Sequence, residues 1–346
     1  MKINIQWMSF STNKVFLLSI CLLFWNAVQA RCDFVNLYSV GNSLTVDLRA
    51  NSGLEVLSSG QSNPVLHDYH VKCGSSLTGI LATPETFCVP SLRWGQLNQA
   101  FATNAPTRFN AVTLQPFYGN TIRGEVNAAN SLIGMIRANP LNSDTRIMVY
   151  ATWAMQSDGP FLSRWNQTGL TLDSPFVPSA QSYQLFMNEL RLTVPSAEII
   201  PVGHVMAEIA QRLAVNPNAI PGFGSTSDFY RDDIHASNAT SYIAGVTAFA
   251  TIYNKSPVGL GTSWVYDLNG YGTSLSPEGR AAVQSITWEV TQGFTAVPEP
   301  TSIALLATVI VISGLGQFFL RTSQRLKTHA KSPDMVGHSK VPCQIT

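Results

Sequence analysis

The sequence predicts an α/β fold, a three-layer α/β/α sandwich with a central parallel sheet. Short apolar segments rich in β-branched and aromatic residues alternate along the chain with longer segments whose apolar residues recur at helical spacing. Strands that alternate with helices are typical of a parallel sheet with helices on both faces. The strand segments are short, mainly apolar runs, as expected of buried strands.

The predicted strands are short and end in turn or polar residues. They are expected at 33–40, 54–58, 109–116, 146–153 and 198–203. The first runs directly into Gly41-Asn42-Ser43, a sequence typical of a buried strand followed by a tight turn. The third, Phe109 to Pro116, has a polar end at Gln115.

The predicted helices follow the strands and carry start signals. They are expected at 91–103, 125–138, 180–192, 204–213, 237–253 and 277–291. Ser91 is the expected cap of the first helix, with Leu92 on its inner face, and Ser276 with Pro277 opens the last one. The segment 154–179 is rich in Gly, Pro and Ser and is expected to form a surface loop or lid.

Composition excludes two classes of protein. The chain has 346 residues, of which 45% are hydrophobic and 12% charged, so it lacks the low hydrophobicity and high net charge of disordered chains. Its 21 basic residues balance 20 acidic ones, for a net charge of +1. No basic block occurs in the body of the chain, and we therefore expect no nucleic-acid partner.

The first 30 residues have the pattern of a signal peptide. Lys2 and Lys14 supply a positive start, and residues 15–25 form an apolar stretch too short to span a bilayer. Val28 and Ala30 provide small residues at the −3 and −1 positions, which predicts cleavage after Ala30. The alternative is a retained membrane anchor.

A second apolar segment lies near the other end of the chain. Residues 302–320 contain no charge and are long enough to cross a bilayer core. Arg321, Arg325 and Lys327 follow, which predicts a cytoplasmic side there. The order of Val297-Pro298-Glu299-Pro300, apolar span and basic cluster resembles the PEP-CTERM sorting signal of Gram-negative bacteria, over residues 297–327.

This resemblance implies a fate for the chain. Such a signal is a temporary membrane anchor that an exosortase-type enzyme recognises and removes. We therefore expect export across the inner membrane, transient anchoring, and release to the cell surface or extracellular matrix. A polar tail, 328–346, continues past the basic cluster, unlike most such signals, and a permanent anchor is the alternative. The remaining residues, 31–296, are expected to form one domain.

The body of the chain keeps three cysteines. Export to an oxidising compartment favours one disulfide with one thiol left over. Cys73 and Cys88 are the preferred pair because the loop between them is short and rich in Gly, Ser and Pro; the alternative is that Cys32, Cys73 and Cys88 are all buried thiols. No C-x-x-C pair occurs, which argues against a zinc ribbon or a redox centre.

Three residues could form a nucleophilic site. A serine hydroxyl is a weak nucleophile until an imidazole, oriented by a carboxylate, removes its proton. Ser43 follows the first strand, at the carboxyl end where open parallel sheets build their sites. Asp232 and His235 lie three residues apart at the start of the 237–253 helix, so one turn could carry both base and orienting group.

At these residues the chain resembles the SGNH/GDSL hydrolase family. Gly41-Asn42-Ser43-Leu44-Thr45 resembles its first block and Asp232-x-x-His235 its last. The resemblance implies a flavodoxin-like α/β/α sandwich and hydrolysis of esters, often O-acetyl groups on carbohydrate, by a Ser43-His235-Asp232 triad without metal or organic cofactor. It also implies an oxyanion hole formed by the N–H groups of Ser43 and Gly74.

The chain departs from this family in one block. A Gly-x-Asn-Asp sequence is expected after the middle strand, with the asparagine in the oxyanion hole. Here the strand ends in Gln115-Pro116, and Asn120 follows in the loop. Gln115 is favoured over Asn120 because a strand end is better fixed. Loss of one oxyanion donor costs about 10²–10³ in rate, so the alternative is a non-catalytic matrix or polysaccharide-binding protein that keeps the fold.

Other candidate residues carry less specific signals. His67 and His70 lie three apart, but no further cluster completes a metal site, so none is predicted. His204 follows a strand and either lines the cleft or is structural. Trp153 and Met155 also follow a strand, and either shape the substrate pocket or pack in the core.

Overall fold

The central sheet has five strands, all parallel. A computed structural model describes residues 34–49, 53–261 and 270–295. The strands are β1 (Val35–Gly41), β2 (Val65–Val71), β3 (Ala111–Leu114), β4 (Arg146–Tyr150) and β5 (Glu198–Ile200). They pair in the order β2-β1-β3-β4-β5, which is the flavodoxin-like order.

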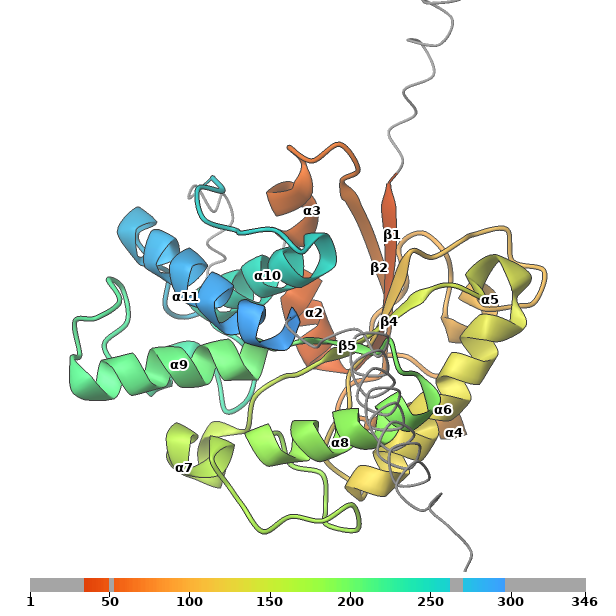
Figure 1. Cartoon of the computed structure of the whole chain (residues 1–346), viewed down its shortest axis with the longest axis horizontal. Helices are drawn as coiled ribbons and strands as arrows, with labels where there is room; N and C mark the ends of the chain where they lie inside the picture. The colour runs from red at the N-terminus through yellow and green to blue at the C-terminus, as the bar shows by residue number, and fades with distance from the viewer. Residues whose placement is uncertain (1–33, 50–52, 262–269, 296–346) are drawn as a thin grey trace, which may run out of the picture. The chain divides into compact units, whose positions relative to one another are not determined.

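Helices cover both faces of this sheet, which confirms the predicted three-layer α/β/α fold (Figure 1). One face carries α2 (Ser43–Arg49), α3 (Gly53–Ser58), α9 (Val202–Val215), α10 (Asn238–Tyr253) and α11 (Pro277–Thr295). The other carries α4 (Leu77–Ala82), α5 (Leu97–Ala100), α6 (Ile122–Ala138) and α8 (Ala180–Thr193). Short helices at α7 (Phe161–Trp165), Pro140–Asn142, Gln156–Asp158 and Thr226–Phe229 lie in connections.

Helix α10 occupies the interior of its layer. Every residue from Asn238 to Ile252 is buried, which fits a helix that is apolar on all sides. Its start is fixed by the Ser237 hydroxyl, which accepts a hydrogen bond from the N–H of Thr240. It ends at Asn254, which has a left-handed φ of 47°. This start lies directly after His235 and orients the loop that carries it.

The predicted second strand was wrong. Residues 53–58 form helix α3, in which Leu54, Leu57 and Ser58 are buried at i, i+3 and i+4. The real second strand, β2, is partly polar, but its polar groups are buried and bonded. Asp68 accepts hydrogen bonds from the N–H groups of Leu92, Arg93 and Trp94, and His67 bonds to Ser39.

The same contacts explain a second error, the long helix predicted at 91–103. Only Leu97–Ala100 is helical. The Ser91 hydroxyl donates to the Asp68 carboxylate at 2.6 Å, and Leu92 is 55% exposed. The buried carboxylate therefore holds 91–94 as a bent loop instead of a helix. The segment 154–179, predicted to be a loop, contains the short helix α7 and the Gln156–Asp158 turn. Two further short helices, α2 and α4, were not predicted.

The predicted disulfide is confirmed. Cys73 and Cys88 are bonded, with their Cα atoms 5.7 Å apart. No helix within 34–49, 53–261 and 270–295 is both long and apolar enough to cross a membrane. The predicted signal peptide, sorting signal, 302–320 span and polar tail all lie outside these described residues.

Candidate active site

Ser43 lies at the carboxyl edge of the sheet. β1 ends at Gly41, and α2 begins at Ser43 with only Asn42 between them. The Asn42 side chain Oδ1 accepts a hydrogen bond from the N–H of Leu44 at 3.0 Å. This bond satisfies one of the free N–H groups at the start of α2. It leaves the Ser43 side chain partly exposed at the first position of the helix.

Gln115, at the end of β3, braces this turn. Its Oε1 accepts hydrogen bonds from the N–H of Asn42 at 3.1 Å and from the Thr45 hydroxyl at 2.7 Å. Its Nε2 donates to Asn42 Oδ1 at 2.8 Å. The side chain is fully buried. The Gln115 amide is therefore directed at the residues on either side of Ser43, which it holds in place.

Gly74, at the end of β2, lies next to the same turn. Asn42 Nδ2 donates to the carbonyl of Ser75 at 3.2 Å, so the Gly74-Ser75 segment is tied to the residue before Ser43. Gly74 has a φ of 65°, the left-handed region that favours glycine. Within the part of the chain that the structure describes, neither the Ser43 nor the Gly74 N–H donates to a protein acceptor. Both groups remain free for an oxyanion.

Asp232 and His235 form a hydrogen-bonded pair. Asp232 Oδ2 lies 2.8 Å from His235 Nδ1, and its Oδ1 accepts hydrogen bonds from the N–H groups of Ile234 and His235. Burial alone would raise the pKa of Asp232, but these bonds outweigh it and lower the pKa to about 2. Asp232 is therefore a carboxylate at neutral pH that fixes the His235 ring through Nδ1 and leaves Nε2 for a substrate or nucleophile.

The segment after β4 holds the loop that carries Asp232 and His235 from one side. The Trp153 indole N–H donates to the carbonyl of Ile234 at 2.7 Å. The N–H of Gln156 donates to the carbonyl of Asp233 at 2.7 Å, and the Asp233 side chain accepts from the N–H and hydroxyl of Ser157. Trp153 is fully buried, so its role is core packing and support of the loop, not the lining of a substrate pocket.

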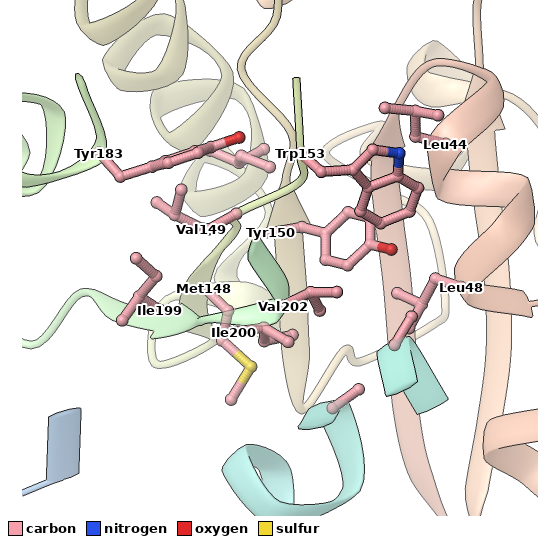
Figure 2. Close-up of a cluster of buried hydrophobic side chains, with 14 of the residues drawn as sticks. Leu44, Leu48, Met148, Val149, Tyr150, Trp153, Tyr183, Ile199, Ile200 and Val202 are labelled. Carbon is pink, nitrogen blue, oxygen red and sulfur yellow. The ribbon is translucent and has the colours of Figure 1, made fainter. Parts of the chain in front are cut away.

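Helix α2 holds the loop from the other side. Asp47, one turn after Ser43, accepts a hydrogen bond from the N–H of Ala236, the residue after His235, at 3.0 Å. Figure 2 shows part of the buried apolar cluster, to which Leu44 and Leu48 of α2 belong together with Tyr150 and Trp153. The nucleophile helix and the base loop, far apart in sequence, are thus joined by a direct bond.

Two other predicted candidates, Asn120 and His204, have partners of their own. Asn120 Nδ2 donates to the Thr78 hydroxyl at 2.7 Å, so its amide braces α4 against the start of α6. His204 packs between the rings of Trp165 and Phe294. Burial lowers the pKa of His204 to about 4. It lines a cavity of about 290 Å³ with α8 that contains none of the candidate catalytic residues.

Sequence reasoning missed two residues at this site, Asp47 and Arg231. Arg231 Nη1 donates to Asp47 Oδ1 at 2.7 Å. The one signal for Asp47 in the sequence was its position four residues after Ser43. Two residues at this spacing lie on the same face only if they belong to a helix, so the signal depends on Ser43 being the start of one. Among the described residues, no three His, Cys, Asp or Glu side chains lie together as a metal-binding group.

The chain is similar in fold to a solved structure, and a second solved structure matches it more weakly. A DUF4886 family protein from Bacteroides uniformis matches with a TM-score of 0.51 and 16% identity, over 78% of this chain and 99% of that one. A Streptococcus pneumonia chain described provisionally as a platelet activating factor matches with a TM-score of 0.39 and 13% identity, over 70% of this chain and 100% of that one. At these identities the likeness concerns the fold alone. No family model matches the chain, and no curated protein matches it.

Proposed function

We propose that this chain is an exported serine esterase that hydrolyses ester groups through Ser43, His235 and Asp232. The observation that carries the proposal is the hydrogen bond between Asp47, on the Ser43 helix, and the residue after His235. The His235–Asp232 bond and the two free N–H groups of Ser43 and Gly74 add support. A base oriented by a carboxylate and N–H donors for an oxyanion are two of the parts that acyl transfer by a serine requires.

The proposed reaction proceeds in two steps. The Ser43 hydroxyl attacks the ester carbonyl while His235 Nε2 takes its proton, and Asp232 stabilises the imidazolium that forms. His235 then returns the proton to the leaving alcohol, and the acyl group stays on Ser43 Oγ. In the second step water attacks the acyl group while His235 takes its proton, and His235 then gives that proton to Ser43 Oγ as the acid leaves. The Ser43 and Gly74 N–H groups stabilise the oxyanion in both steps, with no metal or organic cofactor in the scheme.

The test is turnover of p-nitrophenyl acetate by the full-length chain and by Ser43→Ala. Loss of the nucleophile should lower kcat by about 10³-fold or more. His235→Gln should lose a comparable amount, because the two residues act as one unit. A fluorophosphonate should label the wild-type chain at Ser43, as located by peptide mass analysis, and leave Ser43→Ala unlabelled. Equal turnover in wild type and Ser43→Ala would contradict the proposal.

One observation favours a second candidate, a non-catalytic matrix or polysaccharide-binding protein. Gln115 is engaged with Asn42 and Thr45, and Asn120 with Thr78, so each side-chain donor considered for the oxyanion hole has another partner. Such a protein would bind carbohydrate without Ser43-dependent turnover. Retention on an insoluble polysaccharide by both wild type and Ser43→Ala, with no hydrolysis by either, would support this candidate.

We infer the cellular location from the ends of the chain. The Cys73–Cys88 disulfide supports an oxidising compartment. Export would remove residues 1–30, and an exosortase-type enzyme would act at 297–327 after transient anchoring through 302–320. The expected substrate class, acylated extracellular polysaccharide, follows from this location. Sequencing of the mature ends tests the inference: it should give Arg31 as the first residue, and an intact chain through Thr346 would favour a permanent anchor.

A further inference from the structure

Asp47 is a buried carboxylate between the two halves of the candidate active site. It lies four residues after Ser43 on α2 and its side chain is 1% exposed. Its Oδ2 accepts a hydrogen bond from the N–H of Ala236 at 3.0 Å, and its Oδ1 accepts one from Arg231 Nη1 at 2.7 Å. The two donors flank the segment that contains Asp232 and His235.

Arg231 closes this segment into a compact loop. Its backbone N–H donates to the carbonyl of His235 at 3.0 Å, and its Nη1 also donates to the carbonyl of Ala236 at 2.7 Å. Its guanidinium lies over the Tyr271 ring, 4.2 Å from the centroid. The guanidinium that pairs with Asp47 is therefore held in one place by the Ala236 carbonyl and the Tyr271 ring, while the backbone N–H of Arg231 bonds to the carbonyl of His235.

A buried ion pair of this kind has a cost. Burial raises the pKa of Asp47, although the Arg231 charge and the Ala236 N–H oppose that rise. Buried pairs contribute little to stability compared with apolar residues of similar volume. The Asp47 carboxylate instead fixes the position of the loop that carries His235, because it joins a rigid helical turn of α2 to both ends of that loop.

We propose that Asp47 is a positioning residue, which fixes loop 231–236 against α2 so that the His235 ring meets the Ser43 hydroxyl. This inference rests on the proposed function. Asp232 orients the imidazole within its own loop, and Asp47 places that loop relative to the nucleophile. Loss of the Asp47 carboxylate therefore changes how His235 approaches Ser43, although Asp47 itself does not contact the substrate.

The test is Asp47→Asn in the full-length chain, with p-nitrophenyl acetate. A small misplacement of reacting groups lowers rate by up to about 10²-fold, so kcat should fall by about 10- to 100-fold. KM should change less than about twofold, because ground-state binding is untouched. The rate of Ser43 labelling by a fluorophosphonate should fall by the same factor as kcat.

Asp68→Asn is the matched control. Asp68 is also a buried carboxylate, and it accepts hydrogen bonds from the backbone N–H groups of its neighbour Tyr69 and of 92–94 and from the Ser91 hydroxyl, all outside α2 and loop 231–236. This variant should lose stability and keep kcat. Arg231→Gln provides a second test of the same link if Asp47→Asn does not fold. The loss of kcat in Asp47→Asn combined with Arg231→Gln should be smaller than the product of the two single effects, because the two residues share one contact and fix the same loop.

The outcomes separate the two proposals. If Asp47→Asn and Arg231→Gln keep the kcat of an active wild type, as Asp68→Asn should, the positioning role is overturned and the esterase proposal stands. If wild type itself shows no Ser43-dependent turnover or labelling, the esterase proposal fails and the positioning role fails with it. A rise in KM at unchanged kcat would also contradict the positioning role.

Discussion

Gln115 and Asn42 form a reciprocal pair of hydrogen bonds: Gln115 Oε1 accepts from the Asn42 backbone N–H, and Gln115 Nε2 donates to the Asn42 side chain. The pair joins the carboxyl ends of β3 and β1, and Asn42 extends it to the segment after β2 through Ser75. Three strand ends thus meet at the residue before Ser43. The turn is rigid because each buried polar group in it has a partner.

The close packing of this turn predicts opposite effects for two glycine substitutions. A Cβ at Gly41 would lie 2.2 Å from Thr45 Oγ1 and 2.5 Å from Gln115 Oε1. Gly41→Ala should therefore lower the free energy of unfolding by about 1–3 kcal/mol. Gly134, on the exposed side of α6, has no atom within 4 Å of such a Cβ, and Gly134→Ala should raise it by about 0.5–1 kcal/mol. Urea denaturation measures both, and equal effects would contradict the packing argument.

The Cys73–Cys88 disulfide should stabilise the fold. It closes a loop of 15 residues that contains Gly74. Replacing both cysteines by serine restores the entropy of the unfolded chain, and the free energy of unfolding should fall by about 2–3 kcal/mol. Because the segment that carries Gly74 would also be less constrained, kcat of an active enzyme should fall. An unchanged urea midpoint under oxidising conditions would refute the stabilising role.

The low pKa of Asp232 predicts a contribution to stability at acidic pH. Its pKa is about 2 in the folded chain, below the unfolded value of about 3.9. The unfolded state thus binds a proton first as the pH falls, so the contribution is present above about pH 4 and is lost toward pH 2. Asp232→Asn should give a flatter stability–pH curve between pH 4 and pH 2 in urea denaturation. Because the carboxylate is half exposed, the difference should be modest, and parallel curves would contradict it.

His204 predicts pH dependence in a different range. Burial lowers its pKa to about 4, below the unfolded value of about 6.5. The unfolded state therefore binds the proton first, and stability should fall by about 1–3 kcal/mol as the pH drops from 6.5 to 4. His204→Phe keeps an aromatic ring between Trp165 and Phe294 but removes the titrating group. The difference in the free energy of unfolding between wild type and this variant should change across that range and become independent of pH above pH 7. A difference that is the same at every pH would show that His204 does not titrate there.

The sequence predicted those strands of the sheet whose apolar pattern can be recognised from neighbouring residues alone. β1, β3, β4 and β5 are mainly apolar; β3, β4 and β5 lie within predicted strands, and β1 ends one residue beyond the predicted strand 33–40. β2 was missed because His67, Asp68 and His70 make it polar. These side chains are buried only because Ser39, the 91–94 loop and Gln96 supply partners from elsewhere in the chain. A pattern of hydrophobicity does not show such partners.

The sequence by itself determined the fold class, the Cys73–Cys88 pair, and the candidates Ser43, Asp232 and His235, because strand pattern and short motifs are local properties. Only the tertiary structure decided how these candidates are held together. Asp47 meets Arg231 across 184 positions of the chain, and Gln115 braces the turn at Asn42 across 73. Contacts of this range arise when the sheet order and helix packing bring strand ends together, and no local spacing encodes them.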